Sequence, residues 1–335
     1  MNKSEMKRKR KQRKILLTII MILFTGIVLT ASTYAWFTAN QTVTVEQIDV
    51  NVAASNGLQI SVDGLNWKPY ISKSDITGAS TTYTSAVNQV PNSMVPVSTV
   101  GATDTATGFM KMFKGEILAG DDEVNYANIL TATQTVEQNT TEAGDFIAFD
   151  MFFQLNEAKQ IYLTSNTSVK AKGTSKGIEN AARVAFILEG NTANGSDKAT
   201  IQGMKTPQTP VIWEPNYDTH TEAAVNNAIN NYGKNITTTS GVVPYHGVSA
   251  PIASSDKQIL SSTNASFFAE VTPDITTTSA AGISAEKYEK VFSLQPGITK
   301  VRIYMWIEGQ DVDCENDASG SDLSYNLQFS ILDKA

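Results

Sequence analysis

The sequence predicts a mostly β protein: an antiparallel β-sandwich with a polar insertion of loops and one short helix, preceded by an N-terminal hydrophobic helix. Three observations support this prediction. Apolar and polar residues alternate in many segments after residue 41, which is the period of strands with one buried face. Residues 190–280 lack such runs and are rich in Thr, Ser, Asn, Gly and Pro. Residues 15–29 form an apolar run that only Thr18, Thr25 and Gly26 interrupt.

The first 35 residues have the order of an export signal, which is basic, then apolar, then small. Its eight basic residues are Lys3, Lys7, Arg8, Lys9, Arg10, Lys11, Arg13 and Lys14. Because Lys and Arg resist translocation, residues 36–335 are expected to form an extracellular domain. Ala35 and Thr33 are small residues that predict cleavage before Trp36. The stretch Ile15–Ala35 would also span a bilayer, at about 30 Å as a helix, so a retained single-pass membrane anchor is the alternative.

Composition narrows the functions that the chain can have. It carries 26 Lys and Arg against 33 Asp and Glu, a net charge of −7, and loss of the eight basic residues and Glu5 takes that to −14. Nucleic acid is therefore not an expected partner, because phosphates need a basic surface. The single cysteine, Cys314, permits no intramolecular disulfide, which favours a bacterial exported protein over a disulfide-rich animal one. We expect Cys314 to be a small buried hydrophobe, with an intermolecular crosslink as the alternative.

The first strand is predicted over Thr42–Val52. Its apolar positions alternate but slip in phase at Glu46-Gln47, which predicts a β-bulge. These positions are Val43, Val45, Ile48, Val50 and Val52. Such a strand would be an aggregation hazard if it were exposed. It either pairs within its own sandwich or serves as a donor strand that completes the open edge of a neighbouring subunit.

The remaining elements follow from the same patterns. Asp63-Gly64 predicts a tight hairpin turn between residues 57 and 67. Further strands are predicted over residues 146–155, 161–163, 182–188, 301–307 and 323–331. Each of the last two alternates apolar with other residues, so one face of each strand is expected to meet solvent. Within the insertion, helical spacing predicts one short helix, from Val225, Ala228, Ile229 and Tyr232.

Acidic residues gather directly after the strand over 301–307. The possible metal ligands there are Glu308, Asp311, Asp313, Glu315 and Asp317. Hard carboxylate oxygens suit Ca²⁺, although the spacing is not that of an EF-hand loop. The alternative is a solvated charge run without a metal, and no other cofactor is expected.

The sequence predicts that the chain is not an enzyme. Neither His220 nor His246 lies in an H-E-x-x-H motif, and no G-x-S-x-G motif occurs. Both histidines are expected to be solvated. A rival hypothesis is an extracellular carbohydrate-binding protein or hydrolase that uses the polar insertion for recognition. The candidate stacking residues for a sugar are Trp36, Trp67, Trp213 and Trp306, although core packing is the simpler expectation for Trp67 and Trp306.

The segment Thr33–Asn40 resembles the junction of signal peptides that are handled by the SipW type of signal peptidase. Small residues and Ala35 precede an aromatic residue, Phe37 and a polar start there. Such peptides belong to the camelysin/TasA-like family of Gram-positive surface and biofilm-matrix proteins. The resemblance implies a jelly-roll β-sandwich and assembly into fibres, in which the mature N-terminal segment inserts as a strand into the next subunit.

Taken together, these patterns predict an exported bacterial protein of the cell surface or extracellular matrix with a structural role. Self-association is the expected interaction. Contact with the membrane is expected during export or through a retained N-terminal anchor.

Overall fold

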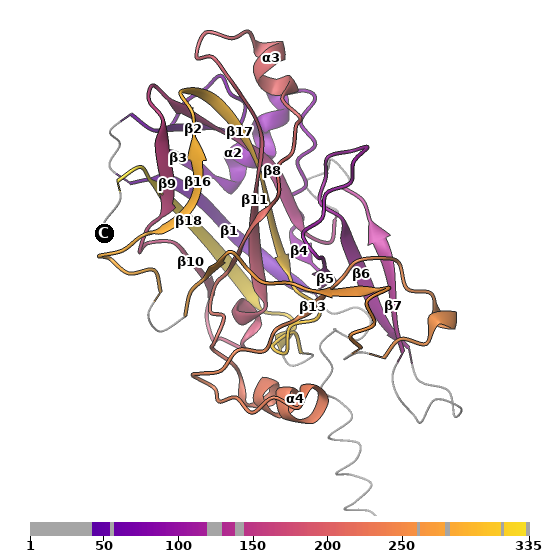
Figure 1. The fold of residues 1–335 in the computed structure, drawn as a ribbon. Coiled ribbons are helices and arrows are strands. Elements are labelled where there is room, and N and C mark those ends of the chain that lie inside the picture. Colours follow the sequence, from indigo (N-terminus) through magenta and orange to yellow (C-terminus); the bar gives the residue numbers. More distant parts are fainter. Residues whose placement is uncertain are drawn as a thin grey trace, which may run out of the picture.

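A computed structural model describes most of the chain after residue 41. The described ranges are 42–53, 57–118, 129–137, 144–259, 262–278, 282–315 and 318–332. They form several β-sheets with few and short helices, which confirms the mostly β prediction (Figure 1). The predicted N-terminal hydrophobic helix lies outside these ranges. Within them, no helix is both long enough and apolar enough to cross a membrane.

Sheet A has seven strands, ordered β16-β9-β18-β1-β3, with β10 beside β18 and β4 beside β1. Its strands are β1 (Val43–Val52), β3 (Tyr70–Ser72), β4 (Ser93–Met94), β9 (Lys159–Leu163), β10 (Ser168–Ala171), β16 (Glu289–Leu294) and β18 (Asp322–Ser330). The pairing of β1 with β18 is parallel, so the prediction of purely antiparallel pairing is wrong here. The two strands come from opposite ends of the chain, and no hairpin between them imposes an antiparallel direction.

Sheet B has six strands in the order β15-β12-β11-β17-β8-β2. These strands are β2 (Gln59–Ser61), β8 (Ile147–Leu155), β11 (Ala182–Thr192), β12 (Val211–Glu214), β15 (Ile275–Thr276) and β17 (Gly297–Ile307). Strands β12 and β15, which pair in parallel, come from the polar segment 190–280. That segment therefore contributes strands to the sheet as well as surface loops.

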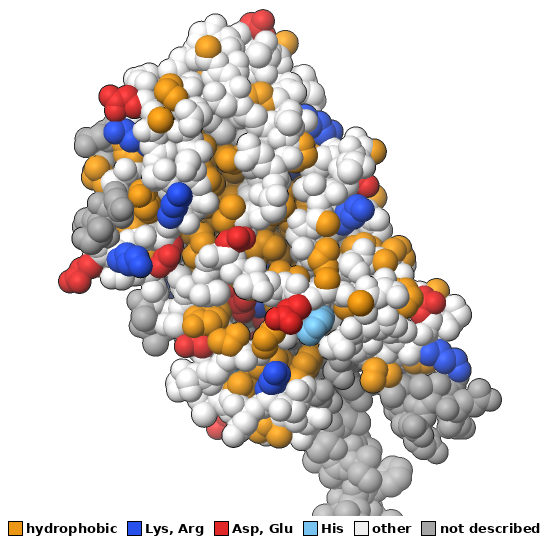
Figure 2. All heavy atoms as spheres, in the orientation of Figure 1, with side chains coloured by type: hydrophobic (Ala, Val, Ile, Leu, Met, Phe, Trp, Pro, Cys, Tyr) orange, Lys and Arg blue, Asp and Glu red, His pale blue; other side chains and the backbone are white. Residues whose placement is uncertain are grey.

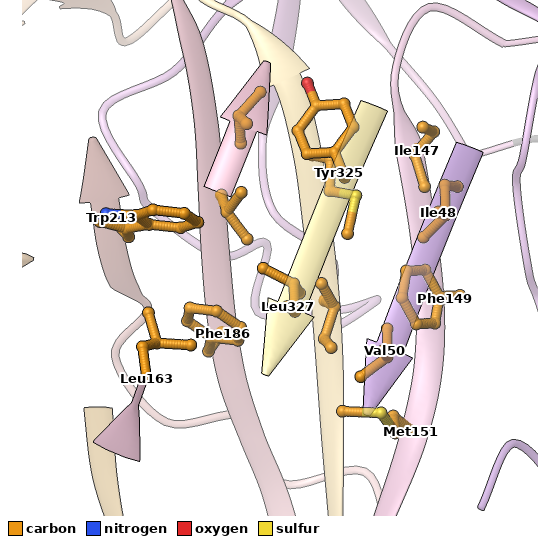
Figure 3. Close-up of a cluster of buried hydrophobic side chains, with 14 of the residues drawn as sticks. Ile48, Val50, Ile147, Phe149, Met151, Leu163, Phe186, Trp213, Tyr325 and Leu327 are labelled. Carbon is orange, nitrogen blue, oxygen red and sulfur yellow. The ribbon is translucent and has the colours of Figure 1, made fainter. Parts of the chain in front are cut away.

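One hydrophobic cluster joins sheets A and B. It takes alternate residues from β1 and β18 on one side and from β8, β11 and β17 on the other. Figure 3 shows Ile48 and Val50 of β1 beside Ile147, Phe149 and Met151 of β8. Phe153, Phe186 and Phe329 pack edge to face within the same cluster.

The opposite face of sheet B is covered as well. All positions of β17 are buried, so the expectation that its alternate residues meet solvent is wrong. The long connections between the strands of sheets A and B fold back over this face. Val97, Met112 and Tyr245 of these connections pack against Tyr304 and Trp306 of sheet B. Two smaller sheets belong to these connections, with strands β5 (Val97–Ser98), β6 (Met112–Leu118), β7 (Ile129–Thr135), β13 (His246–Val248) and β14 (Phe268–Glu270). In β18, by contrast, buried and half-buried residues alternate as predicted.

Short helical elements complete the described chain. They are α2 (Lys73–Gly78), α3 (Lys198–Gly203), α4 (Glu222–Tyr232) and the 3-10 turns η1 (Ala79–Thr81), η2 (Ile178–Asn180) and η3 (Ser254–Asp256). Helix α4 is the one predicted in the insertion. Thr221 caps its start by accepting the N–H of Ala224, and Gly233 ends it with a positive φ of 63°.

One local prediction is confirmed and a second is confirmed in part. The register of β1 against β18 shifts between Val45 and Gln47, which is the predicted bulge. The chain reverses at Asp63 and Gly64 as predicted: Gly64 has a φ of 71°, and Asp63 Oδ1 accepts the N–H of Leu65 at 2.9 Å. The reversal is wider than the predicted tight hairpin, because the pair that closes it is Ile60 and Lys68.

Candidate functional site

Strand β1, the possible donor strand, pairs within its own chain in this structure, which is one of the two alternatives that its sequence leaves open. It has two unequal edges. One edge pairs with β18 along nearly its whole length, from Thr44–Asp322 to Val52–Phe329. Further backbone bonds extend this pairing at both ends, from Gly320 N–H to Thr42 O and from Ala53 N–H to Phe329 O. The long ladder with β18 is thus the main backbone attachment of β1.

The other edge of β1 is only partly paired. Strand β4 pairs at Val43 and Thr44, and β3 pairs from Asp49 to Asn51. Between them, Val45 donates its N–H to Asn92 O at 3.1 Å, and its carbonyl accepts from Lys73 Nζ at 2.6 Å. Two short strands and a lysine therefore close the edge that a full-length neighbour would otherwise occupy.

The side chains of β1 are integral to the core. Of the five predicted donor-strand residues, Val43, Val45, Ile48 and Val50 are fully buried, and Val52 is partly buried. Burial of such a side chain contributes about 1.5–3 kcal/mol. After β1, the chain crosses to sheet B, where β2 is an edge strand beside β8. Without β1, sheet A would present the open backbone edge of β18. The core would also lose the side chains of Val43, Val45, Ile48 and Val50, and we call the apolar space that they fill the slot of β1.

The predicted acidic cluster lies beneath the insertion, and it is buried. Asp311 forms an ion pair with Arg183, whose guanidinium also lies 2.7 Å from Glu214 Oε1. Arg183 is fully buried and stacks over the ring of Tyr245, 5.1 Å from its centroid. Burial raises the pKa of Glu214 to about 7, although the Arg183 charge opposes that shift.

Asp313 links the acidic segment to helix α4. Its carboxylate accepts the backbone N–H of Thr221 at 3.0 Å and lies 2.7 Å from His220 Nδ1. Burial by itself would lower the pKa of His220, but the bond and charge of Asp313 outweigh burial and raise it to about 9. The expectation of a solvated His220 is therefore wrong: the residue is buried, its other ring nitrogen lies 2.8 Å from Gly241 O, and the ring joins the insertion to the acidic segment.

The outer members of the acidic cluster also have protein partners. Glu308 is fully buried and accepts from the indole of Trp306 and the N–H of Gln310, each at 3.1 Å. Burial raises its pKa to about 7. Glu315 accepts from the Thr221 hydroxyl at 3.0 Å. Asp317 lies outside the described residues.

The predicted calcium site remains a prediction. Among the described residues, no group of three or more His, Cys, Asp or Glu is arranged to hold a metal ion. Protein donors already occupy Asp311 and Asp313, so a cation would have to compete with them. The signal that sequence reasoning missed is Arg183, a cation near the start of the predicted apolar strand 182–188.

The tryptophan side chains give little support to the rival hypothesis of carbohydrate binding. Trp213 and Trp306 are fully buried, and the Trp213 indole donates to Thr277 at 3.1 Å, so neither offers a face for a sugar. Trp67 is partly buried against the cluster around Phe152. Trp36 lies outside the described residues, together with Ala35 of the predicted cleavage site.

The hydrolase hypothesis would need a histidine beside a nucleophilic side chain. His220 instead contacts Asp313 and Gly241. Cys314 is buried in the core, as expected for a small hydrophobe.

The surface in the view of Figure 2 shows scattered single Lys and Arg side chains rather than a basic patch.

Comparisons with protein-family models, curated proteins and solved structures found no match to this chain. The geometry of β1 and its slot is therefore the main structural basis for a functional proposal.

Proposed function

We propose that this protein is an exported structural protein of the bacterial cell surface or extracellular matrix, and that it assembles into fibres by exchanging its N-terminal strand. The observation that carries the proposal is the position of β1. It is the first described strand, it fills the core of sheet A, and its main ladder runs along a strand from the other end of the chain.

We infer that sheets A and B are the two layers of a β-sandwich of the jelly-roll kind that the sequence resemblance implies. Their shared hydrophobic cluster supports this inference. In such a sandwich, removal of β1 opens one layer along the edge of β18. The strand of a second copy would fill the same slot with the same backbone bonds and the same four buried side chains.

Strand exchange requires little new chemistry. The ladder to β18 and the apolar contacts are equal in the closed subunit and in the exchanged pair, so the difference in free energy lies in the connection after Ala53 and in protein concentration. Because each subunit gives its strand to the next, the contact is heterologous and would generate an open filament. Cleavage before Trp36 would free the strand end, whereas a retained anchor would tether it at the membrane.

The experiment uses a reporter disulfide across the ladder. Asn51 and Gln328 are partners in the β1–β18 register, and Gln328 Nε2 donates to Asn51 Oδ1 at 2.7 Å. The Asn51→Cys, Gln328→Cys protein is allowed to polymerise, is then oxidised, and is examined on a denaturing non-reducing gel. Strand exchange predicts a ladder of covalent oligomers, because each new disulfide joins two subunits.

The single variant Asn51→Cys is the matched control, since it can give no more than covalent dimers. The native Cys314 is fully buried and should stay out of the reaction. Polymer whose subunits are internally linked monomers would show that β1 stays with its own chain and would refute strand exchange. A protein that forms no filaments at any concentration by electron microscopy would refute the fibre function itself.

A further inference from the structure

Three charged side chains from three neighbouring strands meet on the covered face of sheet B. Lys300 comes from β17, Asp150 from β8 and Glu189 from β11. Lys300 Nζ lies 3.0 Å from Asp150 Oδ2 and 2.8 Å from Glu189 Oε2. All three residues are at most 5% exposed. β17 lies between the other two strands, so its lysine reaches a carboxylate on each side.

The surroundings hold the two reacting groups in contact. Lys300 Nζ donates a further bond to Met204 O at 3.0 Å, and its charge faces the ring of Tyr83. Asp150 accepts from the Tyr83 hydroxyl at 2.8 Å and from Arg302 Nη1 at 2.6 Å. A buried ammonium and a buried carboxylate are thereby fixed against each other, a placement that costs several kcal/mol per ion in desolvation.

We propose that Lys300 and Asp150 become joined by an amide bond between Nζ and Cγ, with Glu189 as the proton carrier. In the structure, Lys300 Nζ lies 3.0 Å from Asp150 Oδ2. Intramolecular reactions between groups held at this separation gain effective concentrations of about 10⁵–10⁸ M. The product is a covalent crosslink between β8 and β17 that relieves the burial of both charges.

The reaction balances without any co-reactant. The Lys300 ammonium gives one proton to Glu189, which passes it to an oxygen of Asp150, and the neutral amine then attacks Cγ of the resulting carboxylic acid. The new Nζ–Cγ bond forms as one Cγ–O bond breaks. The departing oxygen takes two of the three ammonium protons, one by way of Glu189, and leaves as a single water molecule. An ammonium and a carboxylate thus become a neutral amide plus water, with no change of oxidation state.

Each neighbour has a defined part in this step. Burial, and then the charge of Asp150, raise the pKa of Glu189, so Glu189 takes a proton more readily than Asp150. Burial lowers the pKa of Lys300, but the charges of Asp150 and Glu189 outweigh burial and raise it, so the transfer from Lys300 to Glu189 is uphill and is offset by the loss of two buried charges in the amide. Burial also raises the pKa of Asp150, but Arg302 and Lys300 outweigh that effect and hold it below its usual range. Arg302 and Tyr83 would stabilise the oxyanion that forms as the amine adds to Cγ. A cavity of about 200 Å³ beside these groups has room for the released water.

A second buried ionic cluster in the same molecule cannot undergo this reaction. The second buried cluster, around Arg183, also pairs a cation with carboxylates from other strands. Its cation is a guanidinium, which stays protonated and therefore cannot attack a carboxyl carbon. The proposal thus applies to the lysine cluster and to no contact of Arg183.

The experiment measures mass under denaturing conditions, where an ion pair separates and an amide persists. The protein is purified from the expressing cells in the form that they produce, and N-terminal sequencing defines the chain for which the sequence mass is calculated. We expect its mass to fall below the sequence mass by one water molecule. Protease digestion should yield a branched peptide that contains both residue 150 and residue 300. A folded protein with the full sequence mass and two separate peptides would overturn the proposal.

Two variants test the chemistry. Lys300→Arg keeps the positive charge but cannot condense, so it should have its full sequence mass. Glu189→Gln keeps the side-chain shape but cannot carry the proton, so the bond should form far more slowly or not at all. Circular dichroism establishes that each variant is folded. A branched peptide formed at the wild-type rate in folded Glu189→Gln would overturn the assigned role of Glu189.

Discussion

Strand β17 is buried on both faces, but the two faces differ in chemistry: one is purely apolar, and the other combines apolar side chains with paired charges. On β17, Val301, Ile303, Met305 and Ile307 face the core that sheet B shares with sheet A. The residues between them are also buried, yet they include Lys300 and Arg302 with their carboxylate partners. The first face is stabilised by the removal of apolar area from water. The second depends on pairing charges that water would otherwise solvate.

This difference teaches how an alternating sequence should be interpreted. Polar residues at every second position indicate that one face of a strand differs from the other, but not that this face meets solvent. In β18, the half-buried alternate residues agree with the simple interpretation. In β17, long connections cover the charged face, and the charges bind one another. The two faces should therefore respond differently to substitution, to pH and to added cations.

Loss of the Arg183 charge should give the largest effect. Arg183→Met leaves Glu214 and Asp311 buried without their cation, which is expected to lower the free energy of unfolding by about 3–5 kcal/mol. Chemical denaturation at neutral pH measures this change. The triple variant Arg183→Met, Glu214→Gln, Asp311→Asn removes all three charges and should recover part of the loss.

The matched variant on the apolar face is Ile303→Val, at a fully buried position of the same sheet. It removes one methyl group and should cost about 0.5–1.5 kcal/mol. If Arg183→Met proves no more destabilising than Ile303→Val, the Arg183 charge is not needed to stabilise the buried Glu214 and Asp311.

Features that local chemistry decides could be predicted from the sequence. The bulge at Glu46-Gln47 follows from the slip in alternation, and the turn at Asp63-Gly64 follows from the residues that tolerate a positive φ. Helix α4 was predictable from its apolar spacing. Each of these features depends on residues within about one turn or one strand of each other.

Features that depend on distant partners could not be predicted in this way. Asp311 and Arg183 are 128 residues apart, and Asp313 and His220 are 93 apart. The acidic segment alone is equally compatible with solvent, a metal ion or buried cations. The parallel pairing of β1 with β18 is similar, because strands from opposite ends of the chain have no connecting turn that fixes their direction.

The charged face should make stability depend on pH. Burial raises the pKa of Glu214 and Glu308 to about 7 and that of Asp313 to about 6. The folded state therefore binds these protons more tightly, and the stabilisation is lost as pH rises through 6–7. The raised pKa of His220, about 9, acts in the same direction, because its stabilisation is lost as pH rises through 9. We expect the free energy of unfolding to fall between pH 5 and pH 9 by about 3 kcal/mol or more, the value for one such carboxyl.

Denaturation curves across this range test the dependence, and Glu308→Gln should flatten it. Ile303→Val should shift the whole curve without changing its slope, because the substitution removes no group that titrates. The contribution of Asp63 to the pH dependence has the opposite sign. Burial would raise the pKa of Asp63, but hydrogen bonds, first from Thr82, outweigh burial and lower it. Its contribution is lost only below about pH 4, outside the tested range. Stability that increases from pH 5 to pH 9 would contradict the assignment.

Added calcium should change the stability least. This experiment tests whether the acidic segment binds a metal ion or only pairs with protein groups on the charged face. Asp311 Oδ1 accepts the N–H of Asp313 at 2.8 Å, while its other oxygen bonds Arg183. Asp313 is similarly engaged with His220 and Thr221. Calcium that must displace these donors should bind no more tightly than millimolar, and a ligand present at its Kd adds only about 0.4 kcal/mol. Thermal melts with and without millimolar calcium measure this shift, with Asp311→Asn, Asp313→Asn as the control. A shift of several degrees in the parent protein that disappears in this double variant would instead establish a calcium site, with the two carboxylates released from their protein partners to bind the ion.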